Sequence, residues 1–114
     1  MEMKVVEETN DMTHVALVGR LDVEGVKQIE AQFETYVTSR NKPLIVDISQ
    51  VPFMSSLGMR LLLRCAKSLK AAGCKMALLK PQDLVHEALK IASLDQIFGI
   101  VEEKRQALQY LWGA

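Results

Sequence analysis

The sequence predicts an α/β fold: one domain over residues 1–114, with a mixed sheet of four to five strands and about four helices packed on it. Short apolar runs alternate with longer segments in which apolar residues recur at helical spacing. The first two strand-like runs have no helix between them, so they form a hairpin, whereas the later strands are separated by helices and pair in parallel. A chain of 114 residues is long enough to bury one such core.

The first two predicted strands span residues 3–8 and 14–21 and are joined by turn-forming residues at 9–11. The second strand is nearly all apolar at 15–18, which indicates a central position in the sheet. His14 begins this strand, and we expect its imidazole to be solvated or bonded to backbone rather than catalytic.

A helix and a third strand follow. Asp22 is a good N-cap for the helix, which ends around Thr38 to Asn41. Its apolar stripe, at helical spacing, consists of Val26, Ile29, Phe33, Tyr36 and Val37. Pro43 cannot donate to a strand ladder and therefore stands at the start of the next strand, residues 44–48.

A pair of serines, Ser55 and Ser56, opens the second helix, which ends before a C′ glycine at Gly73. One face of this helix is apolar and is made by Met59, Leu62, Ala66 and Leu69. Its polar face is entirely basic and is made by Arg60, Arg64, Lys67 and Lys70.

The remaining elements are shorter. A buried strand is predicted at 76–79, and a third helix begins at 81–83 and stops at 93–95. We expect the inward stripe of this helix to be Leu84, Ala88 and Ile91. A short edge strand at 97–101 and an amphipathic helix at 103–112, with Ala107, Leu108 and Leu111 inward, complete the chain.

The composition excludes several classes of protein. Basic and acidic residues are equal at 14 each, which argues against a nucleic-acid or membrane-surface partner. No apolar run reaches the roughly 18–20 residues of a membrane span, so no membrane insertion is expected. The start of the chain lacks the pattern of a signal peptide, and we expect a cytoplasmic protein. Cys65 and Cys74 are expected to be buried thiols rather than a redox pair.

No enzyme motif is present. The phosphate-binding patterns GxxxxGK[ST] and GxGxxG do not occur, and the serine segment is not GxSxG. Two histidines and two cysteines give no zinc-like grouping. The sequence therefore predicts no catalytic residue, no cofactor and no metal site.

The serine pair fits three roles, because a helix N-terminus carries unpaired N–H groups and the positive end of the dipole. It can cap the helix, bind an anion or receive a phosphate. Two adjacent hydroxyls exceed what one cap needs, and they follow the carboxyl end of a strand, where α/β folds place ligands. The basic helix face would complement a phosphate or an acidic partner, although a solvated surface is the alternative.

Several segments resemble the STAS domain of bacterial anti-sigma factor antagonists. They are Gly19-Arg20-Leu21-Asp22, Leu44-Ile45-Val46-Asp47-Ile48 and Phe53-Met54-Ser55-Ser56-Leu57-Gly58-Met59-Arg60-Leu61-Leu62. The later Leu94-Asp95-Gln96-Ile97-Phe98 and Gln106-Ala107-Leu108 resemble the closing pattern of that family. The resemblance covers essentially the whole chain.

The resemblance implies a partner-switching protein. Such proteins bind a cognate anti-sigma factor, a serine kinase of the histidine-kinase-like ATPase type, when unphosphorylated, and they are released when that kinase phosphorylates a serine at the helix start. A PP2C-type phosphatase restores the binding form. The family motif is typically Asp-Ser-x-Gly, which places the phosphorylated serine at Ser56, with Ser55 as second choice and in the position of the acid. Asp22 and Asp47 match acidic or amide positions beside the site.

The residues expected to bind the partner are Asp22, Ser55, Ser56, Leu57, Gly58, Arg60, Arg64 and Lys67. Two alternatives remain open. In the first, the protein is a STAS scaffold that does not switch, or a subunit of a signalling or lipid-transport complex. In the second, it binds a nucleotide or another small anion at the helix start. The absence of a glycine-rich loop counts against the second.

Overall fold

A computed structural model describes residues 1–113 and contains one five-stranded mixed sheet, in which the strand order follows the chain. β1 pairs with β2 antiparallel, and β2 to β5 are parallel. The elements are β1 (Glu2–Glu8), β2 (Thr13–Val18), α1 (Val23–Arg40), β3 (Leu44–Gln50), α2 (Ser56–Ala71), β4 (Met76–Leu79), α3 (Asp83–Ile91), a 3₁₀ turn (Leu94–Gln96), β5 (Gly99–Val101) and α4 (Lys104–Trp112). The predicted mixed α/β fold is confirmed; Ala114 lies outside the described residues.

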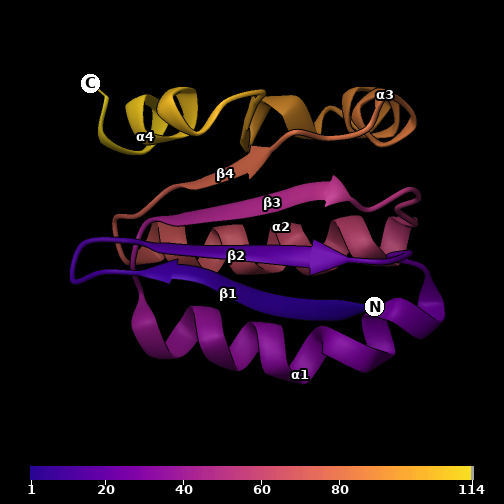
Figure 1. Cartoon of the computed structure of the whole chain (residues 1–114), viewed down its shortest axis with the longest axis horizontal. Helices are drawn as coiled ribbons and strands as arrows, with labels where there is room; N and C mark the ends of the chain where they lie inside the picture. Colours follow the sequence, from indigo (N-terminus) through magenta and orange to yellow (C-terminus); the bar gives the residue numbers. More distant parts are fainter. Residues whose placement is uncertain (114) are drawn as a thin grey trace.

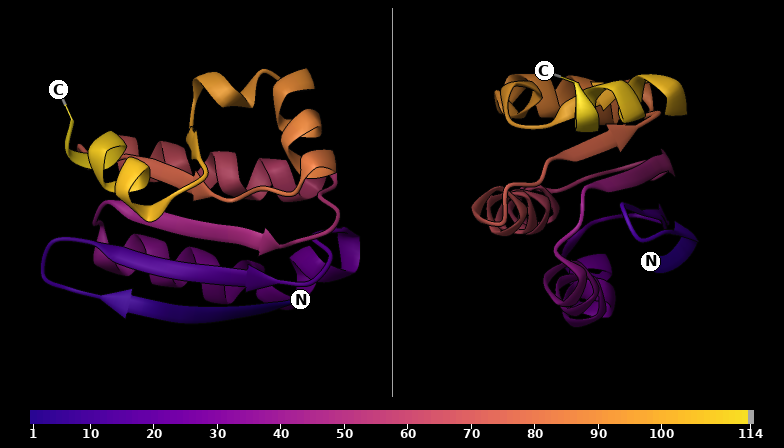
Figure 2. Two further views of the ribbon diagram at one scale, coloured as in Figure 1. Left: turned by 45° about the horizontal axis from the view of Figure 1, so that its top comes forward. Right: turned by 90° about the vertical axis from the view of Figure 1, so that its left-hand side faces the viewer.

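The helices cover the sheet unequally. α1 and α2 lie side by side against one face, and α4 lies against the other face over β4 and β5 (Figures 1 and 2). The larger core cluster fills the first face, where the side chains of Phe33, Leu62 and Val46 are fully buried. A smaller cluster under α4 consists of Met12, Ile45, Ala77, Leu79, Ala107 and Leu111. The face of β1 and β2 opposite α1 has no helix over it in either figure.

The caps that set the helix ends follow from the sequence. Asp22 is the N-cap of α1 and accepts from the N–H of Gly25 at 2.9 Å, as predicted. α2 ends at the C-cap Ala72, and Gly73 follows with φ +79°, also as predicted. The second strand ends at Val18, earlier than predicted, because Gly19 turns the chain with φ +115°.

The predicted inward stripe of α3 is wrong by one position. Val85 and Leu89 are buried, whereas Leu84 is 67% exposed and Ile91 is 78% exposed. Both stripes have helical spacing, so periodicity alone does not separate them. Ala88, between the two stripes, is half-buried.

The expected environment of His14 is also wrong. The side chain is buried, and neither ring nitrogen has a hydrogen-bond partner. It pairs with Glu7 of β1 in the sheet register, and the Lys104 ammonium of α4 lies 2.6 Å from the Glu7 carboxylate. Burial, followed by the positive charge of Lys104, lowers the pKa of the His14 imidazole.

The two cysteines differ, although both were expected to be buried. Cys65 is buried in the main core, and this burial raises the pKa of its thiol to about 12. Cys74 is half-buried at the end of α2 and donates to the carbonyl of Asn41 at 3.4 Å. In α4, Ala107 and Leu111 are buried as predicted, whereas Leu108 is exposed.

Candidate functional site

The candidate site lies at the carboxyl edge of the sheet, where the loops after β2 and β3 meet. The N–H of Leu21 donates to the carbonyl of Phe53, and the N–H of Ser55 donates to the carbonyl of Leu21, both at 2.9 Å. Leu21 and Met54 form an isolated parallel bridge. These bonds extend the β2–β3 pairing beyond the strands, so the start of α2 is held against the loop that precedes α1.

Ser55 is the N-cap of α2. Its side-chain oxygen accepts from the N–H of Gly58 at 3.2 Å, while its hydroxyl donates to the carbonyl of Leu21 at 3.0 Å. Its carbonyl accepts from the N–H of Met59 at 3.0 Å. Both hydrogen-bonding capacities of the hydroxyl are therefore used by the fold.

Ser56 is the first residue of α2 and is exposed. In the part of the chain that the structure describes, its hydroxyl makes no hydrogen bond, and the N–H groups of Ser56 and Leu57 have no acceptor. Leu57 is also exposed. The capping role and the free hydroxyl thus belong to different serines, and two unpaired N–H donors remain at the positive end of the helix dipole.

Gly58 is required by close packing. A Cβ atom on Gly58 would lie 2.6 Å from Cγ of Leu21 and 2.8 Å from the Leu21 carbonyl oxygen. The Leu21 side chain is itself fully buried, so it has little room to move. The first turn of α2 therefore approaches the loop after β2 at a distance that only glycine permits.

The neighbouring acid, Asp22, is engaged in the fold. Its carboxylate accepts from Gly25 and forms an ion pair with Arg20 at 3.4 Å. The Gly25 N–H, and then the Arg20 guanidinium, lower the pKa of the Asp22 carboxyl. Arg20 also lies over the ring of Phe53, 4.6 Å from its centroid. A cation and a carboxylate thus border the start of α2.

The predicted basic face of α2 divides into two parts. Arg64 turns to α1, where it forms ion pairs with Glu30, at 2.8 Å, and with Glu34. Arg60 and Lys67 are exposed and make no ion pair in the part of the chain that the structure describes. Arg64 therefore contributes to helix–helix packing, whereas Arg60, Lys67 and Lys70 make no ion pair among the described residues and offer uncompensated charge.

The structure brings together five of the predicted site residues: Asp22, Ser55, Ser56, Leu57 and Gly58 all lie around the hydrogen-bonded Leu21 segment. Arg60 follows one turn later. Arg64 and Lys67 lie further along α2, roughly 12 and 16 Å from Ser56 at the rise of an α-helix. Asp47 does not lie beside the site, because it alternates with the core residues Val46 and Ile48 and so belongs to the opposite sheet face. Its carboxylate accepts from the N–H of Ser49.

Two features of the site were not found from the sequence. The role of Leu21, whose carbonyl receives two donors from Ser55, has no signal in a single sequence because the contact joins residues 34 positions apart. The pairing of Arg64 with α1 could have been found, since Glu30 and Glu34 lie one turn apart on the polar face of that helix.

Among the described residues, no group of three His, Cys, Asp or Glu side chains could hold a metal ion. None of the helices in residues 1–113 combines the length and the apolar character needed to cross a membrane.

Comparison with known proteins gives consistent results. One relative, BtrV of Bordetella bronchiseptica, is named as a putative anti-sigma factor antagonist. It is 23% identical over 101 residues, which are 89% of this chain and 87% of BtrV. The anti-sigma factor antagonist SpoIIAA of Bacillus superimposes in its unphosphorylated form with a TM-score of 0.79, at 23% identity over 96% of this chain and 95% of SpoIIAA. The phosphorylated form of SpoIIAA gives a TM-score of 0.71, at 22% identity over 96% of this chain and 98% of SpoIIAA.

A STAS domain protein of Planctomyces limnophilus gives a TM-score of 0.81, at 21% identity over 95% of this chain and 96% of that one. At such identities these structures establish the fold. Residues 3–107 match the model of the STAS domain family. By that match, which spans nearly all of the sheet, the serine segment and the first turn of α4, the chain belongs to the STAS domain family.

Proposed function

We propose that this protein is a non-catalytic, cytoplasmic regulator: an anti-sigma factor antagonist in a bacterial partner-switching pathway. In its unphosphorylated form it binds an anti-sigma factor that is also a serine kinase of the histidine-kinase-like ATPase type. The kinase phosphorylates Ser56 and the complex dissociates. A PP2C-type phosphatase returns the protein to its binding form.

The observation that carries this proposal is that the two serines have different structural roles. Ser55 caps α2 and bonds to Leu21, whereas Ser56 is exposed and makes no side-chain hydrogen bond among the described residues. A kinase can therefore reach Ser56 without disturbing the cap. Similarity to SpoIIAA, whose phosphorylated and unphosphorylated forms both have known structures, supports regulation of this protein by phosphorylation.

The start of α2 is suited to carry a phosphate. A phosphoserine brings a charge of about −2 to the positive end of the helix dipole, next to the unpaired N–H groups of Ser56 and Leu57. The domain therefore keeps its fold when modified. A docked partner would meet a strongly hydrated dianion beside the exposed Leu57 side chain, and acidic or apolar groups there would be repelled. Release is then local and electrostatic rather than a large conformational change.

A second function is favoured by Ser55, which occupies the position of the acid in the Asp-Ser-x-Gly motif. Without that carboxylate beside Ser56, the protein would be a STAS subunit that stays bound to its partner and does not switch. The exposed Arg60 and Lys67 would then contact an acidic surface permanently.

One experiment separates the two functions. The protein is incubated with ATP and the kinase encoded beside its gene, and its mass is measured. The switching function predicts a gain of one phosphate on Ser56, unchanged in Ser55→Ala and absent in Ser56→Ala. A complex that forms but leaves Ser56 unmodified favours the non-switching function.

Binding gives the second readout. Ser56→Asp should weaken the complex with the kinase while its circular dichroism stays native, because the added charge lies at the interface and not in the core. Ser68→Asp is the matched control, since Ser68 is an exposed serine three turns further along α2. Equal binding by Ser56→Asp and Ser68→Asp would contradict the proposal.

A further inference from the structure

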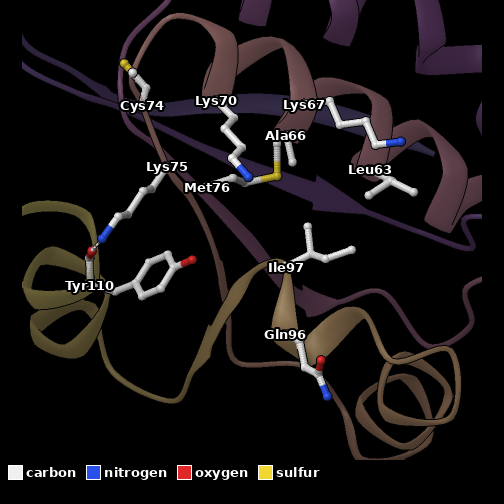
Figure 3. Close-up of a pocket in the computed structure, with 11 residues that line it drawn as sticks. Leu63, Ala66, Lys67, Lys70, Cys74, Lys75, Met76, Gln96, Ile97 and Tyr110 are labelled. Atoms are coloured by element: carbon white, nitrogen blue, oxygen red, sulfur yellow. Dashed lines mark hydrogen bonds between the residues drawn. The ribbon is translucent and has the colours of Figure 1, made fainter.

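A cavity of about 570 Å³ lies beside the second half of α2, between that helix and the segment that runs from β4 to α4 (Figure 3). Its volume is within the range of about 300–1,000 Å³ that is typical of small-molecule sites. Its lining comes from the second half of α2, the turn that follows it, β4, the segment before β5, and α4.

The inner surface of the cavity is mainly apolar. Leu63 and Ala66 line it from α2, Met76 from β4, and Ile97 from the segment before β5. Ile97 is 46% exposed, so a large apolar side chain remains in contact with solvent at this place. An aliphatic chain laid along these residues would remove that surface from water.

The rim of the cavity is positively charged, and no lining residue is acidic. Lys67 and Lys70 make no ion pair among the described residues, and Figure 3 shows both leaving α2 on the side that faces Met76 and Ile97. They are not needed to compensate the end of α2, because the carbonyls of Leu69 and Lys70 already accept from backbone N–H groups. Two ammonium groups are therefore available to an anion.

Tyr110 closes the cavity from the side of α4 and is fixed in place. Its ring packs on Gly99 of β5, where a Cβ atom would lie within 2.7 Å of three ring carbons. Lys75 holds the same residue, with its ammonium 5.1 Å from the ring centroid and 3.4 Å from the Tyr110 carbonyl oxygen. The wall opposite α2 is thus preformed rather than mobile.

We propose that this cavity binds a small organic acid with a medium-length aliphatic chain. The chain lies along Leu63, Ala66 and Ile97, and the carboxylate is held by Lys67 and Lys70. The absence of any lining acid and the apolar inner surface together select this chemistry over a cationic ligand or a short polar anion.

The site is separate from the serine segment. Lys70 lies roughly 21 Å along α2 from Ser56 at the rise of an α-helix. Of the residues expected to bind the protein partner, only Lys67 also lines the cavity. Binding of the acid therefore does not depend on phosphorylation, and its failure would leave the proposed function untouched.

Three probes test the proposal by ¹H,¹⁵N chemical-shift titration of the whole protein, with the two ten-carbon probes kept below their critical micelle concentrations. Decanoate has the chain and the charge, acetate has only the charge, and decyltrimethylammonium has the chain with the opposite charge. We expect decanoate to bind saturably and to shift the amides of Leu63, Ala66 and Ile97. Acetate and decyltrimethylammonium are expected to leave the chemical shifts of these amides unchanged.

Variants give the second test. The double variant Lys67→Gln/Lys70→Gln should weaken decanoate binding by about fivefold to tenfold at low salt, as expected for two solvent-accessible ion pairs. Lys27→Gln/Lys90→Gln is the matched control, because both lysines are exposed and neither lines the cavity. Ile97→Glu, at an exposed position, should abolish binding because it places a charge against the aliphatic chain, while the thermal unfolding of the domain is retained.

Three results would overturn the proposal. Decanoate could shift amides elsewhere and not in the cavity. It could bind no more tightly than decyltrimethylammonium. Its affinity could fall equally in the Lys67→Gln/Lys70→Gln variant and in the Lys27→Gln/Lys90→Gln control.

Discussion

The hydroxyl of Ser55, the N-cap of α2, donates to the carbonyl of Leu21 at 3.0 Å. This hydrogen bond connects the start of α2 to the loop that follows β2. The same oxygen accepts from the N–H of Gly58, so one side chain serves both this connection and the helix cap. Ser56, the next residue, contributes to neither. Two adjacent serines therefore differ in what they do for the fold.

This difference predicts unequal effects on stability. Ser55→Ala should lower the free energy of unfolding by about 1 kcal/mol or slightly more, because the N-cap and the bond to Leu21 are both lost. Ser56→Ala should change it by less than about 0.5 kcal/mol, because the side chain is exposed. Urea unfolding of the two variants measures the difference, and equal values would contradict the assignment of the cap.

Gly58→Ala tests the close approach of α2 to Leu21. Alanine is the better helix former by about 1 kcal/mol, so propensity alone predicts a gain. The added Cβ would lie 2.6 Å from Leu21, and relieving that overlap should cost about 1–3 kcal/mol, so we expect a net loss of stability of up to about 2 kcal/mol. Ser68→Ala, at an exposed position of the same helix, is the control and should be neutral or slightly stabilising. A Gly58→Ala variant at least as stable as wild type would show that the contact relaxes freely.

Arg64→Ala should destabilise the domain, whereas Arg60→Ala should not. Arg64 pairs with Glu30 and Glu34 of α1, an exposed network worth about 1 kcal/mol at low salt. Because these charges are exposed, the difference between the two variants should shrink as salt is added. Chemical unfolding at two salt concentrations checks this. A loss of stability that does not change with salt would assign the effect to packing of the Arg64 alkyl chain instead.

Buried His14 predicts a dependence of stability on pH. Burial and Lys104 lower the pKa of the folded imidazole below 6.5, while the carboxylates of Asp47 and Glu7 oppose this shift without cancelling it. The unfolded state therefore takes up the proton first as pH falls. Stability is fully present above about pH 6.5 and declines as pH falls from there through the folded pKa, by at most about 1.4 kcal/mol per pH unit.

The control for this prediction is His14→Phe, which keeps an aromatic ring in the site and removes the titrating group. The free energy of unfolding of this variant should change less than that of wild type between about pH 7.5 and 5.5. Identical pH profiles for the two proteins would show that His14 does not supply the dependence.

The strands and helices could be predicted from the sequence because each has a strong local pattern. The cap at Asp22 and the glycine at Gly73 needed only their immediate neighbours. α3 could be placed but not oriented, since Leu84, Val85, Ala88, Leu89 and Ile91 support two stripes, and tertiary packing chose the one that contains Val85 and Leu89.

The site shows the same limit. The serine pair could be placed at a helix start from local pattern, but the sequence did not say which serine is the cap, because the answer lies in a bond from Ser55 to Leu21, 34 residues away. The burial of His14 was missed for a similar reason. Its neighbours Glu7 and Lys104 come from opposite ends of the chain.

The order of the strands has a consequence for how the chain reaches this structure. Since β1 to β5 follow one another across the sheet, each new strand finds its partner already formed at the growing edge. No strand must be inserted between two others, and the hairpin of β1 and β2 is complete once residue 18 is available. The sheet can thus assemble in the direction of synthesis, which keeps loop closures short and favours rapid folding on the ribosome.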